Sequence, residues 1–294
     1  MATQPLKARA AALLQAAPFL APALLLFTMF VALPMVEAGW YSLFRWNGYG
    51  RPSEFVALGN FVQLAQDADF RTALANNAWI IAVSLAIQLP LALALAVLLA
   101  EPTTLNHALR TLFFLPYVLA EVAAGLIWRF LYDAEHGVAA GLALKAGLAP
   151  PDLLGEPATA LPALLAVVVW KYLGFYMVLF IAGLQQIDRT LYEAARLDAA
   201  TPWTVFRRIT LPQLSPTIRL GIFFSVLGSL QAFDLVMALT RGGPSNSTHT
   251  MVSYLYEFGV TRMDIGFGSA VGVVLFVLCA GFAWGGRRWL LRSP

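Results

Sequence analysis

The sequence has few charged residues and almost no cysteine. Only 12% of its 294 residues are Asp, Glu, Lys or Arg, whereas 60% are hydrophobic and the mean hydropathy is +0.72. A soluble domain carries roughly 25% charged residues, so this composition excludes an ordinary soluble protein and indicates a chain that crosses a membrane several times. The single cysteine, Cys279, excludes an intramolecular disulfide and any Cys-x-x-Cys metal or redox motif.

The motifs of enzymes are missing as well. The chain has no G-x-x-x-x-G-K-[ST] segment, so it has no P-loop with which to bind ATP. Its three histidines (His107, His136 and His249) are scattered over loops and form no metal-ligand pattern, and no nucleophile and base stand at a catalytic spacing. We therefore expect a protein that is not an enzyme, and we expect no cofactor or metal to be bound by this chain.

Long apolar runs dominate what is present. A membrane-spanning helix needs about 20 apolar residues. The first run has no small-residue cleavage site after it, so we interpret it as a retained span and not as a signal peptide. The sequence predicts an all-α polytopic membrane protein whose six-span domain covers residues 18–290, with short segments at 1–17 and 291–294. The predicted transmembrane helices are Pro18–Leu43, Leu74–Leu99, Leu109–Leu131, Leu161–Leu184, Thr217–Thr240 and Gly268–Leu290.

The distribution of positive charge predicts the orientation of these spans. Eleven of the 19 lysines and arginines fall on the side that holds both termini, and six fall on the other side; Arg129 and Lys171 lie within or at the ends of spans and are left out. Loops rich in Lys and Arg stay in the cytoplasm. We therefore expect both termini to be cytoplasmic.

One polar stretch, EAARLDAATPWTVFRRITLP at Glu193–Pro212, separates the fourth and fifth predicted spans. Its first part is rich in helix formers, Thr201 can cap a second helix, and Pro202 suits a first helical turn. We expect a helix, a turn and a second short helix that Pro212 ends. Such a module, over residues 188–212 on the cytoplasmic side, is more typical of a docking surface than of a linker.

Five ionisable residues lie at membrane depth in the predicted spans, where a charge is costly and marks a candidate functional site. Two interpretations are open. In the first, the cations pair with the acids and fix helix packing. In the second, polar groups beside aromatic rings line a path for a sugar, whose C–H faces stack while its hydroxyls form hydrogen bonds. The five residues are Glu37, Glu121, Arg129, Lys171 and Asp234, and the candidate path consists of Glu121, Lys171, Tyr172, Gln231, Phe233 and Asp234.

The stretch at Glu193–Pro212 resembles the EAA motif of permease subunits in binding-protein-dependent ABC importers. Glu193-Ala194-Ala195 match the motif, Asp198 matches its aspartate, and Ile209-Thr210-Leu211-Pro212 match its ending, whereas Ala199 stands where the family usually has glycine. The resemblance extends along most of the chain and is closest to the carbohydrate permeases, of the maltose and glycerol-phosphate type. The further matching segments are Leu115-Pro116, Leu126–Arg129, Trp170-Lys171, Gly183–Ile187, Phe233-Asp234, Leu239-Thr240, Gly242–Pro244 and Thr248.

The resemblance implies the type I ABC importer fold and an assembly. In such an importer this chain pairs with a second homologous permease subunit, two ATPase subunits bind ATP and Mg²⁺, and an extracytoplasmic binding protein delivers the solute. The implied location is the cytoplasmic (inner) membrane of a bacterium or archaeon, and the implied solute is a sugar, a related polyol or a glycerol phosphate. The residues that would couple the chain to the ATPase are Glu193, Ala194, Ala195, Leu197, Asp198, Ala199 and Arg207.

Two other classes of protein are weighed against this one. A secondary transporter would use Glu121, Lys171 and Asp234 as an ion relay and would transport solute alone, which six spans without an inverted repeat disfavour. A non-transporting scaffold or sensor subunit would tolerate changes at Glu193 without loss of uptake. The sequence favours the permease subunit of an importer over both.

Overall fold

The computed structural model describes residues 18–290, and side chains for residues 18–287. The segments expected at 1–17 and 291–294 lie outside the described residues. Within that range the regular elements are helices, joined by turns and loops, and one two-stranded hairpin. Four of the described helices are long and apolar enough to cross a membrane, and they correspond to the first, second, fourth and sixth predicted spans. They are Pro18–Tyr41, Ala68–Leu98, Pro157–Leu184 and Ile265–Arg287.

The chain divides into two compact units. The first unit holds the residues up to Leu64 together with Phe258–Val273. In it, the helix that includes η1 (Thr28–Ala32) and α2 (Leu33–Tyr41) leads into a hairpin of β1 (Phe44–Arg45) and β2 (Glu54–Phe55), and then α3 (Gly59–Gln66). Asn60 is buried at 4% exposure, and its amide donates hydrogen bonds of 2.8 Å and 2.9 Å to the carbonyl oxygens of Ser42 and Phe44. These bonds hold the chain that leaves the first helix against α3.

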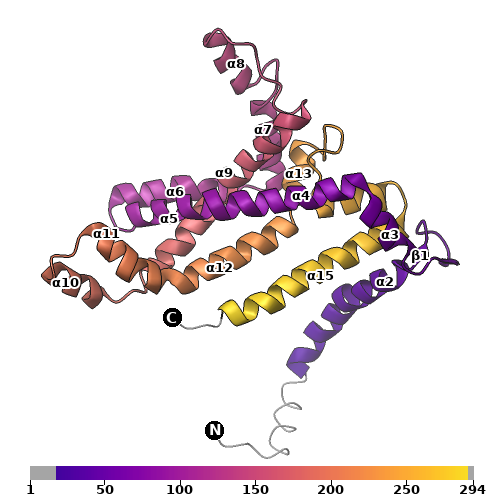
Figure 1. The fold of residues 1–294 in the computed structure, drawn as a ribbon, viewed down its shortest axis with the longest axis horizontal. Coiled ribbons are helices and arrows are strands. Elements are labelled where there is room, and N and C mark those ends of the chain that lie inside the picture. The colour runs from indigo at the N-terminus through magenta and orange to yellow at the C-terminus, as the bar shows by residue number, and fades with distance from the viewer. Residues whose placement is uncertain (1–17, 291–294) are drawn as a thin grey trace, which may run out of the picture. The chain divides into compact units, whose positions relative to one another are not determined.

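The second unit holds Ala65–Glu257 together with the residues from Val274 onward. Its centre is α9, which contacts α4, α5, α6 and α12 (Figure 1). Buried apolar side chains from α5 and α9, such as Leu89, Met177 and Phe180, form one core cluster. The elements, with those that cross into the first unit, are α4 (Ala68–Val83), η2 (Ser84–Gln88), α5 (Leu89–Leu98), α6 (Thr104–Val118), α7 (Glu121–Leu131), α8 (Val138–Lys145), α9 (Pro157–Leu184), α10 (Arg189–Leu197), α11 (Pro202–Val205), η3 (Phe206–Thr210), α12 (Leu211–Leu230), α13 (Asp234–Leu239), α14 (Met251–Tyr254), η4 (Leu255–Thr261) and α15 (Ile265–Leu290).

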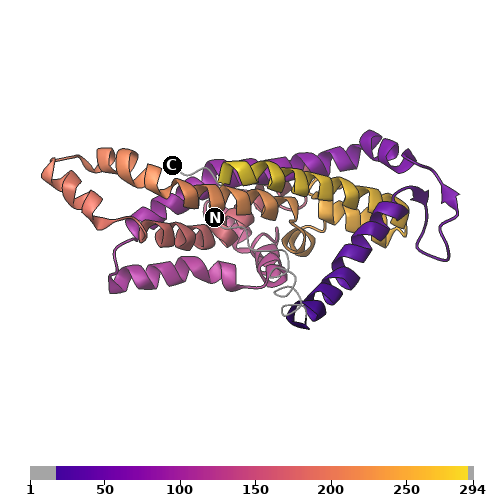
Figure 2. The ribbon, with the colours of Figure 1, turned by 90° about the horizontal axis from the view of Figure 1, so that it is seen from below.

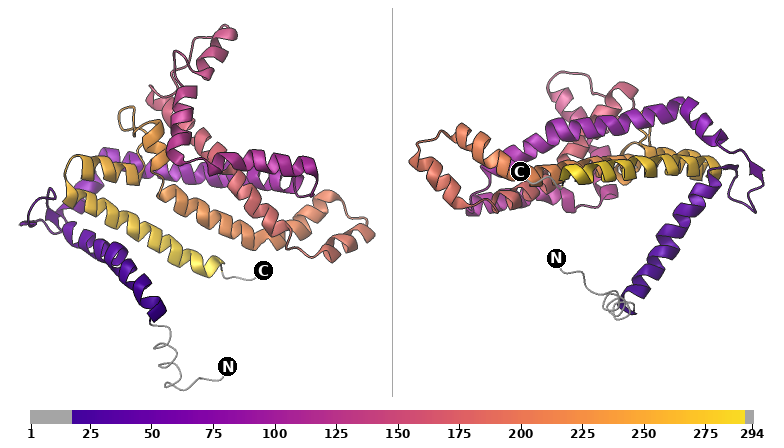
Figure 3. Two further views of the ribbon diagram at one scale, coloured as in Figure 1. Left: turned by 180° about the vertical axis from the view of Figure 1, so that it is seen from behind. Right: turned by 60° about the horizontal axis from the view of Figure 1, so that its bottom comes forward.

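The third predicted span, Leu109–Leu131, is wrong as a single helix. It consists of α6 and α7, whose axes are bent by 98°, and Figure 3 shows α7 leaving the direction of α6. Leu119 and Ala120 adopt extended backbone between them, with ψ of 139° and 141°. Because both halves are apolar, their hydropathy is that of one continuous span. A bend of this size nevertheless needs a break in the backbone hydrogen bonds, which hydropathy does not reveal.

The fifth predicted span, Thr217–Thr240, is also interrupted. Helix α12 ends at Leu230 and α13 begins at Asp234. Irregular backbone at membrane depth is tolerated where other protein groups satisfy its polar atoms. Here Asn77 on α4 donates to the carbonyl of Ser229, and Thr250 Oγ1 donates to the carbonyl of Ala232 at 2.6 Å. Because of these interruptions, the count of six spans stays a prediction.

Three π-helical segments precede prolines within helices. The segments η1, η2 and η3 are each followed, two residues later, by Pro34, Pro90 or Pro212. A proline ring clashes with the carbonyl four residues earlier, and a π turn shifts that carbonyl away. The prediction that Pro212 ends the second short helix is therefore wrong, because the helix runs from Pro202 through η3 into α12.

The expected helix, turn and helix at residues 188–212 are present as α10 and α11, which project at one end of their unit (Figure 2). Asp188 caps α10 by accepting the Thr190 N–H at 2.9 Å, and Thr201 caps α11 by accepting the Thr204 N–H. Hydrogen bonds from the backbone N–H and the side chain of Thr190 hold the pKa of the Asp188 carboxyl below its usual value. The cap of α10 is therefore retained at neutral pH and is lost as the pH falls through the lowered pKa.

Ala199 forms the turn between α10 and α11 with a φ of +52°. A left-handed conformation costs an L-residue roughly 1–2 kcal/mol, and glycine adopts it freely. We expect Ala199→Gly to raise the stability of the protein by up to about 1 kcal/mol, since the gain in the folded state exceeds the entropy that glycine adds to the unfolded chain. Thermal unfolding in detergent measures this effect. The matched control, Ala194→Gly within α10, should lower stability by about 1 kcal/mol. Equal losses in both variants would contradict the strain at Ala199.

Candidate functional site: a cavity in the membrane domain

A cavity of about 240 Å³ lies inside the second unit. Residues from α4, η2, α6, α7, α9, α12 and α13 surround it, so helices far apart in the sequence contribute to one site. Most of its lining is apolar or aromatic, with a small number of polar groups, which is the usual composition of a site for a small molecule. The lining residues are Ile80, Ser84, Gln88, Tyr117, Glu121, Val168, Tyr172, Phe175, Tyr176, Phe224, Ser225, Gly228, Ser229, Ala232, Leu235 and Val236.

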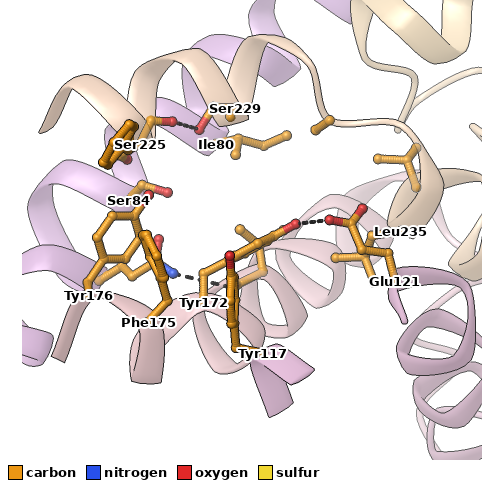
Figure 4. A pocket seen from close by; sticks show the side chains of 16 residues that line it. Ile80, Ser84, Tyr117, Glu121, Tyr172, Phe175, Tyr176, Ser225, Ser229 and Leu235 are labelled. Carbon is orange, nitrogen blue, oxygen red and sulfur yellow. Dashed lines mark hydrogen bonds between the residues drawn. The ribbon is translucent and has the colours of Figure 1, made fainter. Parts of the chain in front are cut away.

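The polar part of the lining centres on Glu121, the first residue of α7. Tyr172 Oη donates a hydrogen bond to Glu121 Oε1, and Figure 4 shows the two side chains meeting at the wall of the cavity. A carboxylate is favoured at the N-terminus of a helix by the backbone dipole. Opposite, the Ser225 hydroxyl is buried and has no hydrogen-bond partner among the described residues. The cavity thus offers one negative acceptor and a free hydroxyl.

Aromatic rings form a second face of the cavity. Tyr117 stacks on Phe175 with ring centroids 4.8 Å apart and meets Tyr172 edge-on at 6.1 Å. Phe175 in turn contacts Tyr176 and Phe224. Rings held against one another in this way present fixed apolar surfaces beside the polar groups.

Two of the six predicted path residues, Glu121 and Tyr172, line the cavity. Lys171 does not: it is 1% exposed, and its ammonium binds backbone carbonyls of Pro116, Tyr117 and Leu119. The other three lie at the break between α12 and α13, outside the cavity lining; Phe233 packs edge-on against Tyr256, and Gln231 and Asp234 are exposed. The role of these four residues in a solute path stays a prediction.

The expected pairing of intramembrane cations with acids is not what the described residues show. No ion pair in that part of the chain involves Lys171, Arg129, Glu121 or Asp234. Carbonyl oxygens take the place of a carboxylate at Lys171.

The sequence interpretation missed the hydroxyl and amide groups of the lining. Ser84 and Gln88 are four residues apart in one apolar helix, and Ser225 and Ser229 are four apart in another. Residues at this spacing share a helix face. Paired polar residues at helical spacing inside apolar runs were therefore the available signal.

The second candidate surface is the projecting hairpin of α10 and α11. Leu197 is 88% exposed and Trp203 is 67% exposed. Both are large apolar side chains, and they lie outside the predicted spans, where lipid would not cover them. Trp203 stacks on Phe206 with centroids 5.8 Å apart. Exposed apolar groups flanked by charges mark a surface that binds another protein. Of the predicted coupling residues, Glu193, Ala194, Leu197, Asp198, Ala199 and Arg207 are exposed, whereas Ala195 is buried.

Apolar helices around a largely apolar cavity with a few polar groups, together with a projecting hairpin that exposes apolar side chains, are typical of a membrane transport component. The chain belongs to the family described as "Binding-protein-dependent transport system inner membrane component", whose model matches residues 8–287. It is therefore an inner-membrane permease subunit of an ABC transporter, as the EAA motif predicted.

Individual relatives agree with this assignment. The chain is 35% identical over 278 residues to the diacetylchitobiose uptake system permease protein NgcF of Streptomyces coelicolor, covering 90% of this chain and 79% of the relative. It is 33% identical to the lactose transport system permease protein LacF of Rhizobium radiobacter, covering 89% of each.

A solved structure shows the same fold. One chain in the crystal structure of a bacterial alginate ABC transporter, in complex with an alginate pentasaccharide-bound periplasmic protein, matches 99% of this chain and 100% of its own length. The TM-score is 0.83 at 24% sequence identity. The predicted type I importer fold is therefore confirmed.

Proposed function

We propose that this chain forms half of the translocation path for an uncharged sugar, delivered by an extracytoplasmic binding protein. The cavity carries this proposal, because aromatic rings beside hydroxyl, amide and carboxylate groups fit a sugar. The relatives' names support a sugar, since they include transport systems for diacetylchitobiose, lactose and trehalose/maltose, and also one for sulfoquinovosyl glycerol; the choice of an uncharged sugar rests on the cavity alone. We further propose that the second half of the path is a homologous permease subunit.

The charge of the cavity narrows the choice of solute. Glu121 contributes a carboxylate, and no Lys or Arg stands among the lining residues. A phosphate group in contact with the lining would face Glu121 and would find no cation there, since the ammonium of Lys171, behind the wall, already binds three backbone carbonyls. This argues against glycerol phosphate, which the sequence alone left open, and in favour of a neutral sugar or polyol.

The hairpin of α10 and α11 is proposed as the surface that docks on one of the two ATPase subunits, and the second permease subunit would dock on the other. Its exposed Leu197 and Trp203 support a buried apolar contact, and Glu193 lies one helical turn before Leu197. ATP and Mg²⁺ would bind to the partner subunits, since this sequence has no P-loop. We propose that the hairpin and both termini lie in the cytoplasm of a bacterium or archaeon, which the distribution of Lys and Arg along the sequence supports.

Uptake into proteoliposomes that contain the complete complex tests the proposal. The probes are radiolabelled lactose, trehalose, maltose, diacetylchitobiose and glycerol 3-phosphate. We expect saturable uptake of at least one of the four sugars and none of glycerol 3-phosphate. Glu121→Gln should lower the rate of sugar uptake about tenfold or more, because it removes a charged hydrogen bond worth about 1.5–3 kcal/mol.

Glu101→Gln is the matched control, because Glu101 is an exposed acid outside the cavity. Equal losses in both variants would contradict a role for the cavity. Uptake by this chain alone, without ATPase subunits, would indicate a secondary transporter instead.

A further inference from the structure

Helix α6 ends at membrane depth, in the middle of the predicted third span. The last carbonyl groups of any helix have no partner within that helix, and leaving them unpaired away from water is costly. Because Leu119 and Ala120 are extended, the N–H groups that follow α6 do not bond to its last carbonyls as they would in a continuous helix. The break therefore needs hydrogen-bond donors from elsewhere in the protein.

Lys171 on α9 supplies those donors. Its Nζ donates to the carbonyl of Pro116 at 3.1 Å, to that of Tyr117 at 3.2 Å, and to that of Leu119. An ammonium group has three N–H donors and no acceptor, so this set of three carbonyls satisfies it completely. Nζ also lies 5.9 Å from the ring centroids of Tyr117 and Tyr172, within range of a cation–π attraction.

The site around Lys171 is built for close contact. Three residues further along α9, a Cβ on Gly174 would lie 2.0 Å from the carbonyl oxygen of Phe113. Lys171 and Gly174 therefore share the face of α9 that meets α6, and the glycine lets the backbones approach. The lysine is 1% exposed, so the three carbonyls take the place of water around its ammonium group.

The neighbouring residue holds the other side of the break. Tyr172 donates to Glu121, the first residue of α7, while Lys171 binds the last turn of α6. Two adjacent side chains of α9 thus fix the ends of both half-helices. Two groups of the cavity, Tyr117 and Glu121, lie on those ends.

We propose that Lys171 is a positioning residue: it holds the break between α6 and α7 open and thereby fixes Tyr117 and Glu121 at the cavity. It does not contact the solute. The proposal rests on the proposed function only in that the cavity belongs to the solute path, because the geometry of the break can be measured without any solute.

The experiment measures that geometry with two spin labels and double electron–electron resonance on the complete complex. Leu112→Cys on α6 and Phe130→Cys on α7 supply exposed label sites, at 62% and 78% exposure. A Cys279→Ser background leaves no other thiol in this chain, and the partner subunits are used as cysteine-free variants. We expect a narrow distance distribution for the parent, and a shifted and broadened one for Lys171→Met, whose side chain has similar length but no donor. Lys171→Arg, which retains the donors, should restore the narrow distribution.

Arg110→Met is the matched control. Arg110 on α6 also binds three carbonyls, those of Leu99, Ala100 and Glu101 at the turn after α5, and it lies outside the cavity lining. Its loss should leave the distribution unchanged. Lys171→Gln loses the charge and offers only two donors to three carbonyls, so we expect a broadened distribution, and it provides a second test where the methionine variant is recovered poorly. A parent-like distribution in either variant, or equal broadening in Arg110→Met, would overturn the proposal.

Discussion

We expect the replacement of Glu193 with alanine to abolish the ATP hydrolysis that copurifies with the permease, while the chain still inserts into the membrane. Glu193 is exposed on α10, and Leu197 one turn later is 88% exposed, so the carboxylate lies beside the apolar centre of the hairpin. Docking would bury both. Removing one partner of a charge pair that is buried at an interface costs about 2–5 kcal/mol, which corresponds to about a 30-fold or larger loss of affinity.

The measurement is a pull-down from native membranes in mild detergent, assayed for ATP hydrolysis and for recovery of the chain. Glu135→Ala is the control, because the side chain of Glu135 is 85% exposed and belongs to the loop between α7 and α8. Copurified ATPase activity at the parent level in Glu193→Ala, with normal uptake, would remove the hairpin from the coupling role.

Gly174→Ala should strongly destabilise the membrane domain, although it adds only one methyl group. The new Cβ would lie 2.0 Å from the carbonyl oxygen of Phe113 and 2.7 Å from the Cα of Phe114, and both are backbone atoms. Backbone cannot rotate away as a side chain does, so α6 and α9 must separate. Overpacking of a well-packed site typically costs 1–3 kcal/mol and occasionally more, and we expect about 3 kcal/mol here.

Gly281→Ala provides the comparison within another long helix. A Cβ at Gly281 meets nothing within 4 Å, so the substitution should stabilise α15 by about 0.5–1 kcal/mol. Thermal unfolding of the two purified variants, run beside the parent, measures the difference. Unfolding midpoints that agree within error would show that the close approach of α6 to α9 does not carry the stability inferred for it.

Hydropathy predicted the continuous helices well, because a run such as 157–184 carries its signal in every residue. It did not predict the break at Leu119 and Ala120. What stabilises that break is Lys171, about fifty residues later in the chain, and a sliding window contains no information on such a partner. The same applies to Asn77, which binds the end of α12 from α4.

The candidate site was predicted in part for a similar reason. An ionisable residue within an apolar run is conspicuous, and so Glu121 was found directly and Tyr172 was found as the neighbour of Lys171. A serine in such a run usually bonds to its own helix, as Ser229 does to the carbonyl of Ser225 at 2.7 Å. Only the packing of α12 against α4 and η2 reveals that these serines also border a cavity. The turn at Ala199, in contrast, was correctly located from the local sequence.

The helix that begins at Pro202 in the hairpin continues through η3 into α12 and ends at Leu230. Trp203 lies near one end of this helical segment, and Ser225 and Ser229 lie near the other end, at the wall of the cavity. One stretch of hydrogen-bonded backbone therefore joins the exposed surface of the hairpin to the cavity. If the hairpin docks on an ATPase subunit as proposed, a displacement of the hairpin is transmitted to the cavity wall along this backbone, and no loop has to carry it.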